Sequence, residues 1–255
     1  MSARPHLAKA PHISVDTHQQ SSLHGFDSKD LQQLEHQLPA SLRLQIQGYT
    51  KRGRVRGWAL APTSAIQLAY LVWRLKPRQI LEFGSGTSTL ALALTARFLE
   101  REGHSCHILS LDQEWKYADR TRFRLTEANL APYADVIHIP LQSQEAFGQS
   151  IFSYGIDAKQ LRQYLQAPVD FAFIDGPASA PLLGRPGSRL GILPLCMNVA
   201  ATSMHFVLDD SKRSKEQSIL KMWSSLQGVE VLEHSKLDRG MSLGLYTAPS
   251  ANPVD

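Results

Sequence analysis

A short loop with two glycines, preceded by a carboxylate, is the first feature of the chain that could do chemistry. Glu82 comes two residues before the sequence Gly84-Ser85-Gly86, and a helical pattern follows directly. The glycines allow a tight turn whose backbone comes close to a ligand, and the N-terminus of the following helix offers free N–H groups. This combination predicts a ligand-binding loop between a strand and a helix.

The residues around this loop distinguish between two classes of nucleotide ligand. A dinucleotide-binding loop needs a third glycine for close packing of helix on strand, and Thr89 occupies that position. Glu82 would also repel a pyrophosphate, whereas S-adenosylmethionine has no phosphate and carries a sulfonium and an ammonium group. Asp112, after the next predicted strand, could accept hydrogen bonds from both ribose hydroxyls. The alternative for each acid is an ordinary helix cap or a surface position.

A second group of carboxylates follows two later strands. Asp175 ends one strand, in the sequence FIDGP, and Asp209 and Asp210 end the next, in VLDD. If both strands are central, the three carboxylates meet and repel one another unless a cation or protons intervene. Such an oxygen-rich site suits Mg²⁺ or Ca²⁺. The alternative is that these acids cap helices and pair with Lys212 or Arg213.

Alternating strands and helices must position these residues. The predicted strands are residues 79–83, 107–111, 135–139, 169–174, 203–208, 229–234 and 241–246, and the predicted helices between them are 88–101, 114–129, 159–166, 188–198 and 215–226. The central strands are short and almost wholly apolar, as in a parallel sheet that is covered on both faces. We therefore expect an α/β fold with a doubly wound, seven-stranded, mostly parallel sheet and helices on both faces. Only residues 235–240 separate the last two strands, so the final strand should be antiparallel, as a hairpin.

The chain ahead of this pattern divides into two parts. Residues 1–27 are rich in His, Ser, Gln and Pro and are expected to form a flexible tail. Residues 28–76 are predicted to form an N-terminal helical segment, with helices over 29–37 and 64–75, that closes over the ligand cleft as a lid or substrate-binding segment. In this segment Trp58 could fold over the cleft. The ligand-binding domain then spans residues 77–248, and 249–255 form a C-terminal tail.

Composition excludes several classes of protein. The chain has 255 residues, 43% of them hydrophobic, and its mean hydropathy is −0.22, as in an ordinary globular protein. No apolar run is long enough for a membrane span or a signal peptide, and two separate cysteines indicate no disulfide framework, so a cytoplasmic location is expected. The net charge of +4 is small, and its one dense cluster, residues 51–56, is interpreted as a solvated loop, which makes a nucleic-acid partner unlikely.

The sequence resembles the class I S-adenosylmethionine-dependent methyltransferases. The resemblance covers residues 62–247 and rests on ILEFGSGTSTLALA, SLDQEW, VDFAFIDGP and HFVLDD, in this order, together with the closing hairpin. It implies S-adenosylmethionine as the cofactor and the following binding residues: Glu82, Gly84, Ser85 and Gly86 at the methionine end, Ser88 and Thr89 near its carboxylate, Asp112 at the ribose, Leu141 and Gln142 near the adenine, and Asp175.

Within that family, the acidic residues are similar to those of the metal-dependent O-methyltransferases of small molecules and sugars. The similarity implies Mg²⁺ (or Ca²⁺) on Asp175, Asp209 and Asp210, and catalytic roles for Asp175, Asp210 and Lys212. Sugar-modifying members commonly have a further Asp as general base, and Pro177 stands at that position here. The implied reaction is O-methylation of a small molecule or glycan. An N- or nucleic-acid methyltransferase, a dinucleotide-dependent oxidoreductase and a non-catalytic cofactor-binding module are the alternatives. The oligomeric state is open, a homodimer included.

A loop bounded by glycine and proline, residues 184–189, should lie on the same edge of the sheet. Arg185 or Arg189 could bind an acidic substrate there. The composition slightly favours a solvent-facing loop in which Ser188 caps the next helix.

Overall fold

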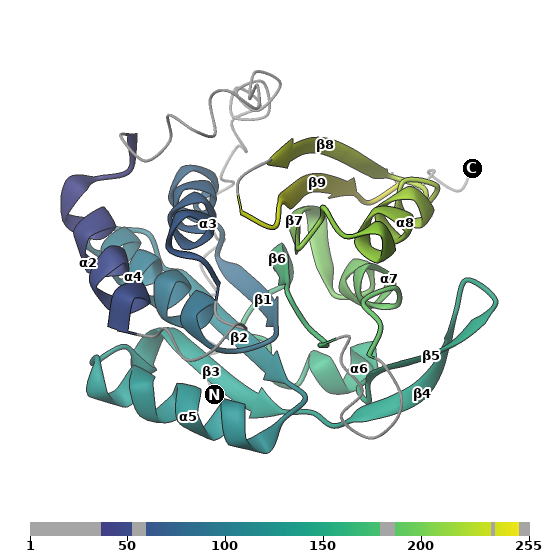
Figure 1. Cartoon of the computed structure of the whole chain (residues 1–255), viewed down its shortest axis with the longest axis horizontal. Helices are drawn as coiled ribbons and strands as arrows, with labels where there is room; N and C mark the ends of the chain where they lie inside the picture. The colour runs from purple at the N-terminus through teal and green to yellow at the C-terminus, as the bar shows by residue number, and fades with distance from the viewer. Residues whose placement is uncertain (1–36, 53–59, 179–186, 236–237, 250–255) are drawn as a thin grey trace, which may run out of the picture.

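The computed structural model describes residues 37–52, 60–178, 187–235 and 238–249. A seven-stranded sheet with helices on both faces forms the body of the molecule (Figure 1). Its strands are, in chain order, β1 (Gln79–Phe83), β2 (His107–Asp112), β3 (Ala134–His138), β6 (Val169–Ile174), β7 (Ala200–Asp209), β8 (Val229–Ser235) and β9 (Met241–Thr247). The sheet order is β3-β2-β1-β6-β7-β9-β8.

The central strands are apolar because both of their faces are covered. Every residue of β1 and β2 is buried, and β6 is buried at all positions except Asp170. β1 pairs in parallel with β2 on one side and with β6 on the other. The chain therefore runs outward from β1 in both directions, and the carboxyl ends of β1 and β6 form the crevice where open α/β sheets bind ligands.

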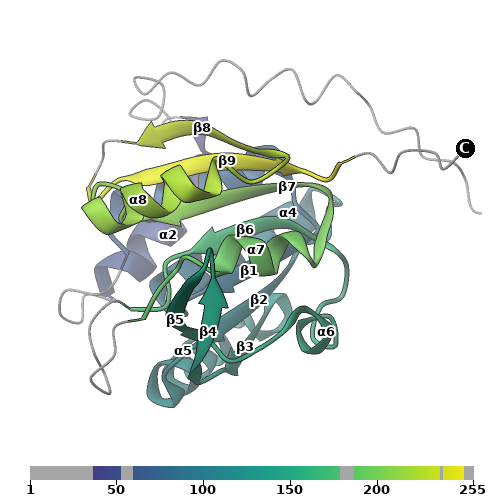
Figure 2. The same cartoon turned by 90° about the vertical axis from the view of Figure 1, so that its right-hand side faces the viewer.

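The last strand inserts antiparallel between β7 and β8, as Figure 2 shows. This confirms the predicted doubly wound sheet with a C-terminal hairpin. All seven predicted strands are present, with bounds that differ by three residues at most at an end.

A second, two-stranded sheet was not predicted. β4 (Leu141–Ala146) and β5 (Gln149–Tyr154) form a hairpin that projects from the main sheet (Figure 1). Phe147 and Gly148 join the two strands, both with positive φ, as a tight hairpin turn requires. Most side chains of β4 and of the first half of β5 are exposed or half-buried, so the sequence lacks the apolar alternation by which strands are recognised.

Helices cover each face of the main sheet as two separate hydrophobic cores. One core includes α2 (Ala40–Arg52), α3 (Pro62–Leu75), α4 (Thr87–Arg101) and α5 (Trp115–Glu127); the other includes α6 (Ala158–Leu161), α7 (Ile192–Met197) and α8 (Ser214–Trp223). α3, α4, α5 and α8 agree with the predicted helices, whereas α6 and α7 are shorter than predicted. No described helix is long and apolar enough to cross a membrane.

The N-terminal segment differs from the prediction at its basic cluster. Lys51 and Arg52 belong to α2, so the expectation of a loop is wrong for these two residues. Leu42 and Ile46 of the same helix are buried against the core that contains α4, and this apolar contact keeps the segment helical. The predicted helix at 29–37, except for Gln37, the rest of the basic cluster and Trp58 lie outside the described residues.

Candidate active site

The loop between β1 and α4 has the backbone that its glycines permit. Gly84 has a φ of 96° and Gly86 a φ of 150°, a region that L side chains rarely adopt. A Cβ on Gly84 would lie 3.0 Å from the backbone nitrogen of Gly176, so the loop packs directly on the end of β6. A Cβ on Gly86 would meet no atom of the described residues within 4 Å, which leaves space for a ligand beside it.

Glu82 lies under this loop and is fully buried. Its Oε2 accepts a hydrogen bond of 2.6 Å from the hydroxyl of Thr89, whereas its Oε1 has no hydrogen-bond partner among the described residues. Burial raises the pKa of Glu82 to about 7, although nearby serine and threonine hydroxyls lower it. An orphaned carboxylate oxygen of this kind is what a cationic ligand group would satisfy.

Thr89 explains why the third glycine is dispensable. Its hydroxyl donates to Glu82 and accepts a hydrogen bond of 2.9 Å from the backbone nitrogen of Gly86. The side chain thus holds both the carboxylate and the loop. Ser88, its neighbour in the first turn of α4, is also buried.

Asp112 braces the same loop from the end of β2. Its Oδ2 accepts hydrogen bonds from the backbone nitrogen (3.0 Å) and the hydroxyl (2.5 Å) of Ser85, and its Oδ1 accepts one of 2.8 Å from the backbone nitrogen of Glu114. Burial raises the pKa of Asp112, and these hydrogen bonds lower it. Asp112 thus bonds to the backbone at the start of α5, while its role at a ribose stays a prediction.

Trp115 follows Asp112 and is 61% exposed, although it is the largest side-chain type. Its ring lies edge-on to His138 and under the guanidinium of Arg122, 4.9 Å away. An exposed indole three residues after Asp112 offers a flat surface on which a purine base could stack. Trp115 was not among the predicted site residues, because the adenine contact was expected only after the third predicted strand, at Leu141 and Gln142.

Gln142, the residue expected near the adenine, lies on β4. Its side chain is exposed and lies against Gly155. The contact is so close that a Cβ on Gly155 would lie 2.5 Å from the Cδ of Gln142. Leu141 begins the same strand and is half-buried.

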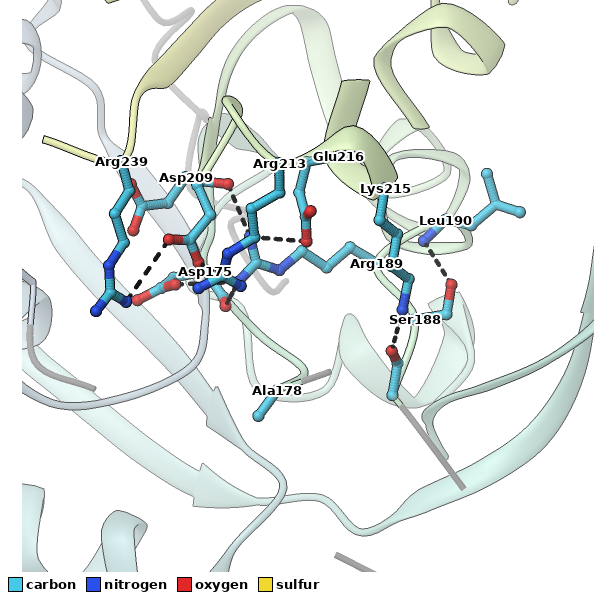
Figure 3. A network of polar contacts seen from close by, with 12 residues as sticks. Asp175, Ala178, Ser188, Arg189, Leu190, Asp209, Arg213, Lys215, Glu216 and Arg239 are labelled. Carbon is cyan, nitrogen blue, oxygen red and sulfur yellow. Dashed lines mark hydrogen bonds and ion pairs between the residues drawn. The ribbon is translucent and has the colours of Figure 1, made fainter. Parts of the chain in front are cut away.

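The three predicted carboxylates converge. Ligand oxygens of Asp175, Asp209 and Asp210 lie within 4.8 Å of one another at the carboxyl ends of β6 and β7 (Figure 3). Asp209 and Asp210 are buried and Asp175 is partly exposed. Burial and the charge of Asp210 raise the pKa of Asp175, whereas the charge of Arg189 lowers it. The pKa of Asp209 lies well above its ordinary value through burial and the charges of the other two acids.

Arg189 is the side chain that occupies the middle of this cluster. It is 3% exposed, and its Nη2 lies 3.2 Å from Asp175 Oδ1 and 3.2 Å from Asp210 Oδ2. The guanidinium also donates to the backbone carbonyl oxygens of Asp175 and Asp209, so it meets Asp209 through the main chain. The expectation of a solvent-facing loop is therefore wrong for residues 187–189, because the acids draw Arg189 into the interior. Ser188 accepts from Leu190 and does not cap α7, whose N-cap is Gly191. Arg185 lies outside the described residues.

Further charged side chains surround the cluster. Arg213 lies 3.0 Å and Arg239 3.8 Å from Asp210, and Glu216, which is fully buried, lies 3.8 Å from Arg189. The predicted pairing with Arg213 is confirmed. The Nζ of Lys212, the other predicted partner, donates a hydrogen bond of 2.9 Å to the carbonyl of Asp238 in the β8–β9 turn.

Tyr154 and Glu216 belong to the site and were not predicted. Tyr154 is buried and packs against Phe83. Its hydroxyl lies so close to Gly176 that a Cβ on that glycine would be 2.4 Å away. Neither residue stands at a strand end of the predicted sheet, so no sequence signal placed them here.

These contacts bear differently on the two implied ligands. The orphaned Glu82 oxygen, the open space at Gly86 and the exposed Trp115 fit S-adenosylmethionine. The three carboxylates fit a divalent cation in their chemistry, but Arg189 already contacts two of them, and an ion that used all three would have to displace the guanidinium.

A cavity of about 400 Å³ lies apart from these residues, at the β3 edge of the sheet. It is lined by residues of β2, β3 and α5, both apolar and polar, together with Ala131 and Tyr164. None of the loop residues or clustered acids lines it.

Comparison with solved structures reveals the same fold in methyltransferases. The chain is 16% identical to an O-methyltransferase of Bacillus cereus in complex with S-adenosylhomocysteine, at a TM-score of 0.56 over 83% of this chain and 93% of that one. It is 12% identical to an S-adenosylhomocysteine-bound methyltransferase of Podospora anserina, at 0.59 over 94% and 100%. It is 16% identical to the O-methyltransferase TomG of Streptomyces achromogenes, which is involved in tomaymycin synthesis and bound to S-adenosylmethionine, at 0.53 over 82% and 91%. The chain matches no protein-family model and no curated protein.

Proposed function

We propose that this protein transfers the methyl group of S-adenosylmethionine to a hydroxyl oxygen of a small molecule or glycan. The observation that carries the proposal is the buried Glu82, with one oxygen held by Thr89 and the other without a partner among the described residues, beneath a glycine loop with open space beside it. Neighbours with the same fold bind S-adenosylmethionine or its demethylated product and include O-methyltransferases.

The cofactor supplies an electrophilic methyl carbon on a sulfonium. Glu82 would hold its ammonium group, Asp112 its ribose and Trp115 its base. Gly84 and Gly86 let the loop backbone approach it, and Ser85, Ser88 and Thr89 keep the loop in shape or donate to its carboxylate.

The protein's task in the chemical step is to orient the acceptor and remove its proton. Asp175 is the partly exposed member of the acidic cluster and follows the strand next to the loop, so its carboxylate would take the proton of the acceptor hydroxyl. The acceptor oxygen then bonds to the methyl carbon as the carbon–sulfur bond breaks, and the electron pair remains on sulfur. Asp210 would keep Asp175 and the arginines in position, and Lys212 would brace the β8–β9 turn. Assistance by Mg²⁺ stays a prediction from the sequence, and no step above requires it.

Binding of S-adenosylhomocysteine to the full chain tests the cofactor assignment. By mass action, a concentration one hundredfold above Kd should stabilise the fold by about 2.7 kcal/mol and raise the melting temperature. NAD is the matched control and should have no effect, because Glu82 repels its pyrophosphate. Binding of NAD with no binding of S-adenosylhomocysteine would refute the proposal.

A further inference from the structure

A side chain already occupies the position at which a metal-dependent methyltransferase would bind its cation. Arg189 Nη2 lies 3.2 Å from one oxygen of Asp175 and 3.2 Å from one of Asp210. Its Nη1 donates a hydrogen bond of 2.7 Å to the carbonyl of Asp209. The guanidinium therefore touches all three residues of the cluster. Figure 3 shows it beside Asp175 and Asp209.

The packing around Arg189 holds its side chain in this position. The side chain is 3% exposed, and the fully buried Glu216 lies 3.8 Å from Nη1, whereas Asp175 and Asp210 contact Nη2. The backbone of the preceding residue is held by a hydrogen bond of 2.8 Å from Ser188 to the carbonyl of Phe152. A buried guanidinium with several charge-assisted hydrogen bonds is costly to remove, because its partners would remain as uncompensated buried charges.

Groups of the chain itself supply positive charge to the cluster. Three guanidiniums, on Arg189, Arg213 and Arg239, form ion pairs with Asp175, Asp210 or Glu216, and the carboxylate of Asp209 adjoins those of Asp175 and Asp210. A divalent ion placed among them would face Arg189 at short range, and like charges at such distances repel strongly where water is excluded.

We propose that Arg189 is the resident cation of this site and takes the place of a divalent metal, so that it positions Asp175 for a metal-independent methyl transfer. Arg189 is a positioning residue, since it is buried and acts on the acceptor only through the carboxylates that it contacts. The catalytic role of Arg189 rests on the proposed function. Its occupation of the cation site does not, and can be measured without a methyl acceptor.

Titration of the full chain with Mn²⁺, followed by electron paramagnetic resonance of the free ion, tests the inference. The wild-type chain should leave Mn²⁺ free up to millimolar concentrations, and its melting temperature should be the same in Mg²⁺ and in EDTA. The variant Arg189→Met should gain one Mn²⁺ site that Mg²⁺ displaces. The matched control Arg213→Met removes a more exposed guanidinium that also contacts Asp210 and should gain none.

Saturable binding of one Mn²⁺ to the wild-type chain would overturn the inference, as would a folded Arg189→Met variant that binds no more Mn²⁺ than the wild type. If that variant does not fold, the wild-type titration and melting comparison decide the matter alone. Binding of S-adenosylhomocysteine to the same samples separates the two proposals: its absence contradicts the proposed function, whereas Mn²⁺ binding by the wild type contradicts only the role of Arg189.

Discussion

At the scale of single residues, Glu82 shows how burial prepares a group for its ligand. Its carboxyl group lies in a place that disfavours charge, and burial raises its pKa to about 7. A cationic ligand group next to the free Oε1 would favour the ionised form. The free-energy cost of ionising this buried acid would therefore be offset by the attraction between its carboxylate and the cationic ligand group.

The pH dependence of stability should reveal this cost. The folded protein binds the Glu82 proton more tightly than the unfolded chain, whose pKa is near 4.5, so the Glu82 contribution to stability falls as the pH rises from 4.5 to about 7. Each pH unit in this window costs up to about 1.4 kcal/mol. Urea unfolding of wild type and Glu82→Gln between pH 4.5 and 8 should show that the variant loses less stability. Parallel curves would contradict the raised pKa.

The same substitution should weaken cofactor binding at high pH. At pH 8 the wild-type carboxylate is ionised, and Glu82→Gln should reduce the affinity for S-adenosylhomocysteine by about ten- to one-hundredfold, the value of a charge-assisted hydrogen bond. Calorimetric titration measures this effect. At pH 6 the wild type should also release protons on binding, seen as a dependence of the heat on the buffer, and the variant should not.

At the scale of elements, the junction between β1 and α4 depends on one side chain of the first helical turn. Thr89 bonds at once to a strand residue, Glu82, and to a loop residue, Gly86. The helix therefore starts at a defined distance from the strand, although the loop contains two flexible glycines. This is the role that a third glycine would otherwise serve by close packing.

Replacement of Thr89 by Val should loosen this junction while it keeps the side-chain shape. The change leaves the Gly86 nitrogen and one Glu82 oxygen without their partner, and we expect a loss of about 1–3 kcal/mol in the free energy of unfolding. Thr95→Val is the control: Thr95 is equally buried on α4, but its hydroxyl bonds only to the carbonyl of Ala91 in the same helix. Chemical unfolding should show a much smaller effect for the control. Equal effects would mean that the junction does not depend on Thr89.

At the scale of the whole molecule, the N-terminal helices are part of the body of the protein. Leu42 and Ile46 of α2 and several residues of α3 share one hydrophobic core with α4 and β1. Ser64, in the first turn of α3, donates a hydrogen bond of 2.9 Å to Asp238 in the turn that carries Arg239 toward the acidic cluster. The segment predicted to cover the site is thus joined to it at one end.

Truncation of a core residue of α2 should measure this integration. Ile46→Ala should lower the free energy of unfolding by about 2–5 kcal/mol, because Ile46 is fully buried. Leu44→Ala, on the exposed face of the same helix at 65% exposure, should change it by less than about 0.5 kcal/mol. Unfolding followed by circular dichroism gives both values. If α2 did not belong to the core, both substitutions would change the free energy of unfolding by small and similar amounts.

Local patterns along the chain were sufficient to predict the strands, the closing hairpin and the binding loop. Buried parallel strands are continuous apolar runs, and the loop and the three acids lie directly after such runs, so Asp175, Asp209 and Asp210 were expected to meet if their strands were central. The β4–β5 hairpin escaped prediction because its largely exposed strands lack that pattern. What balances the charges of these acids could be seen only in three dimensions. Arg189 stands in a segment whose composition is typical of a surface loop. It is buried because its guanidinium lies among the carboxylates of Asp175, Asp210 and Glu216, which come from the ends of β6 and β7 and from α8. Electrostatic pairing across the fold leaves no periodic trace in the chain.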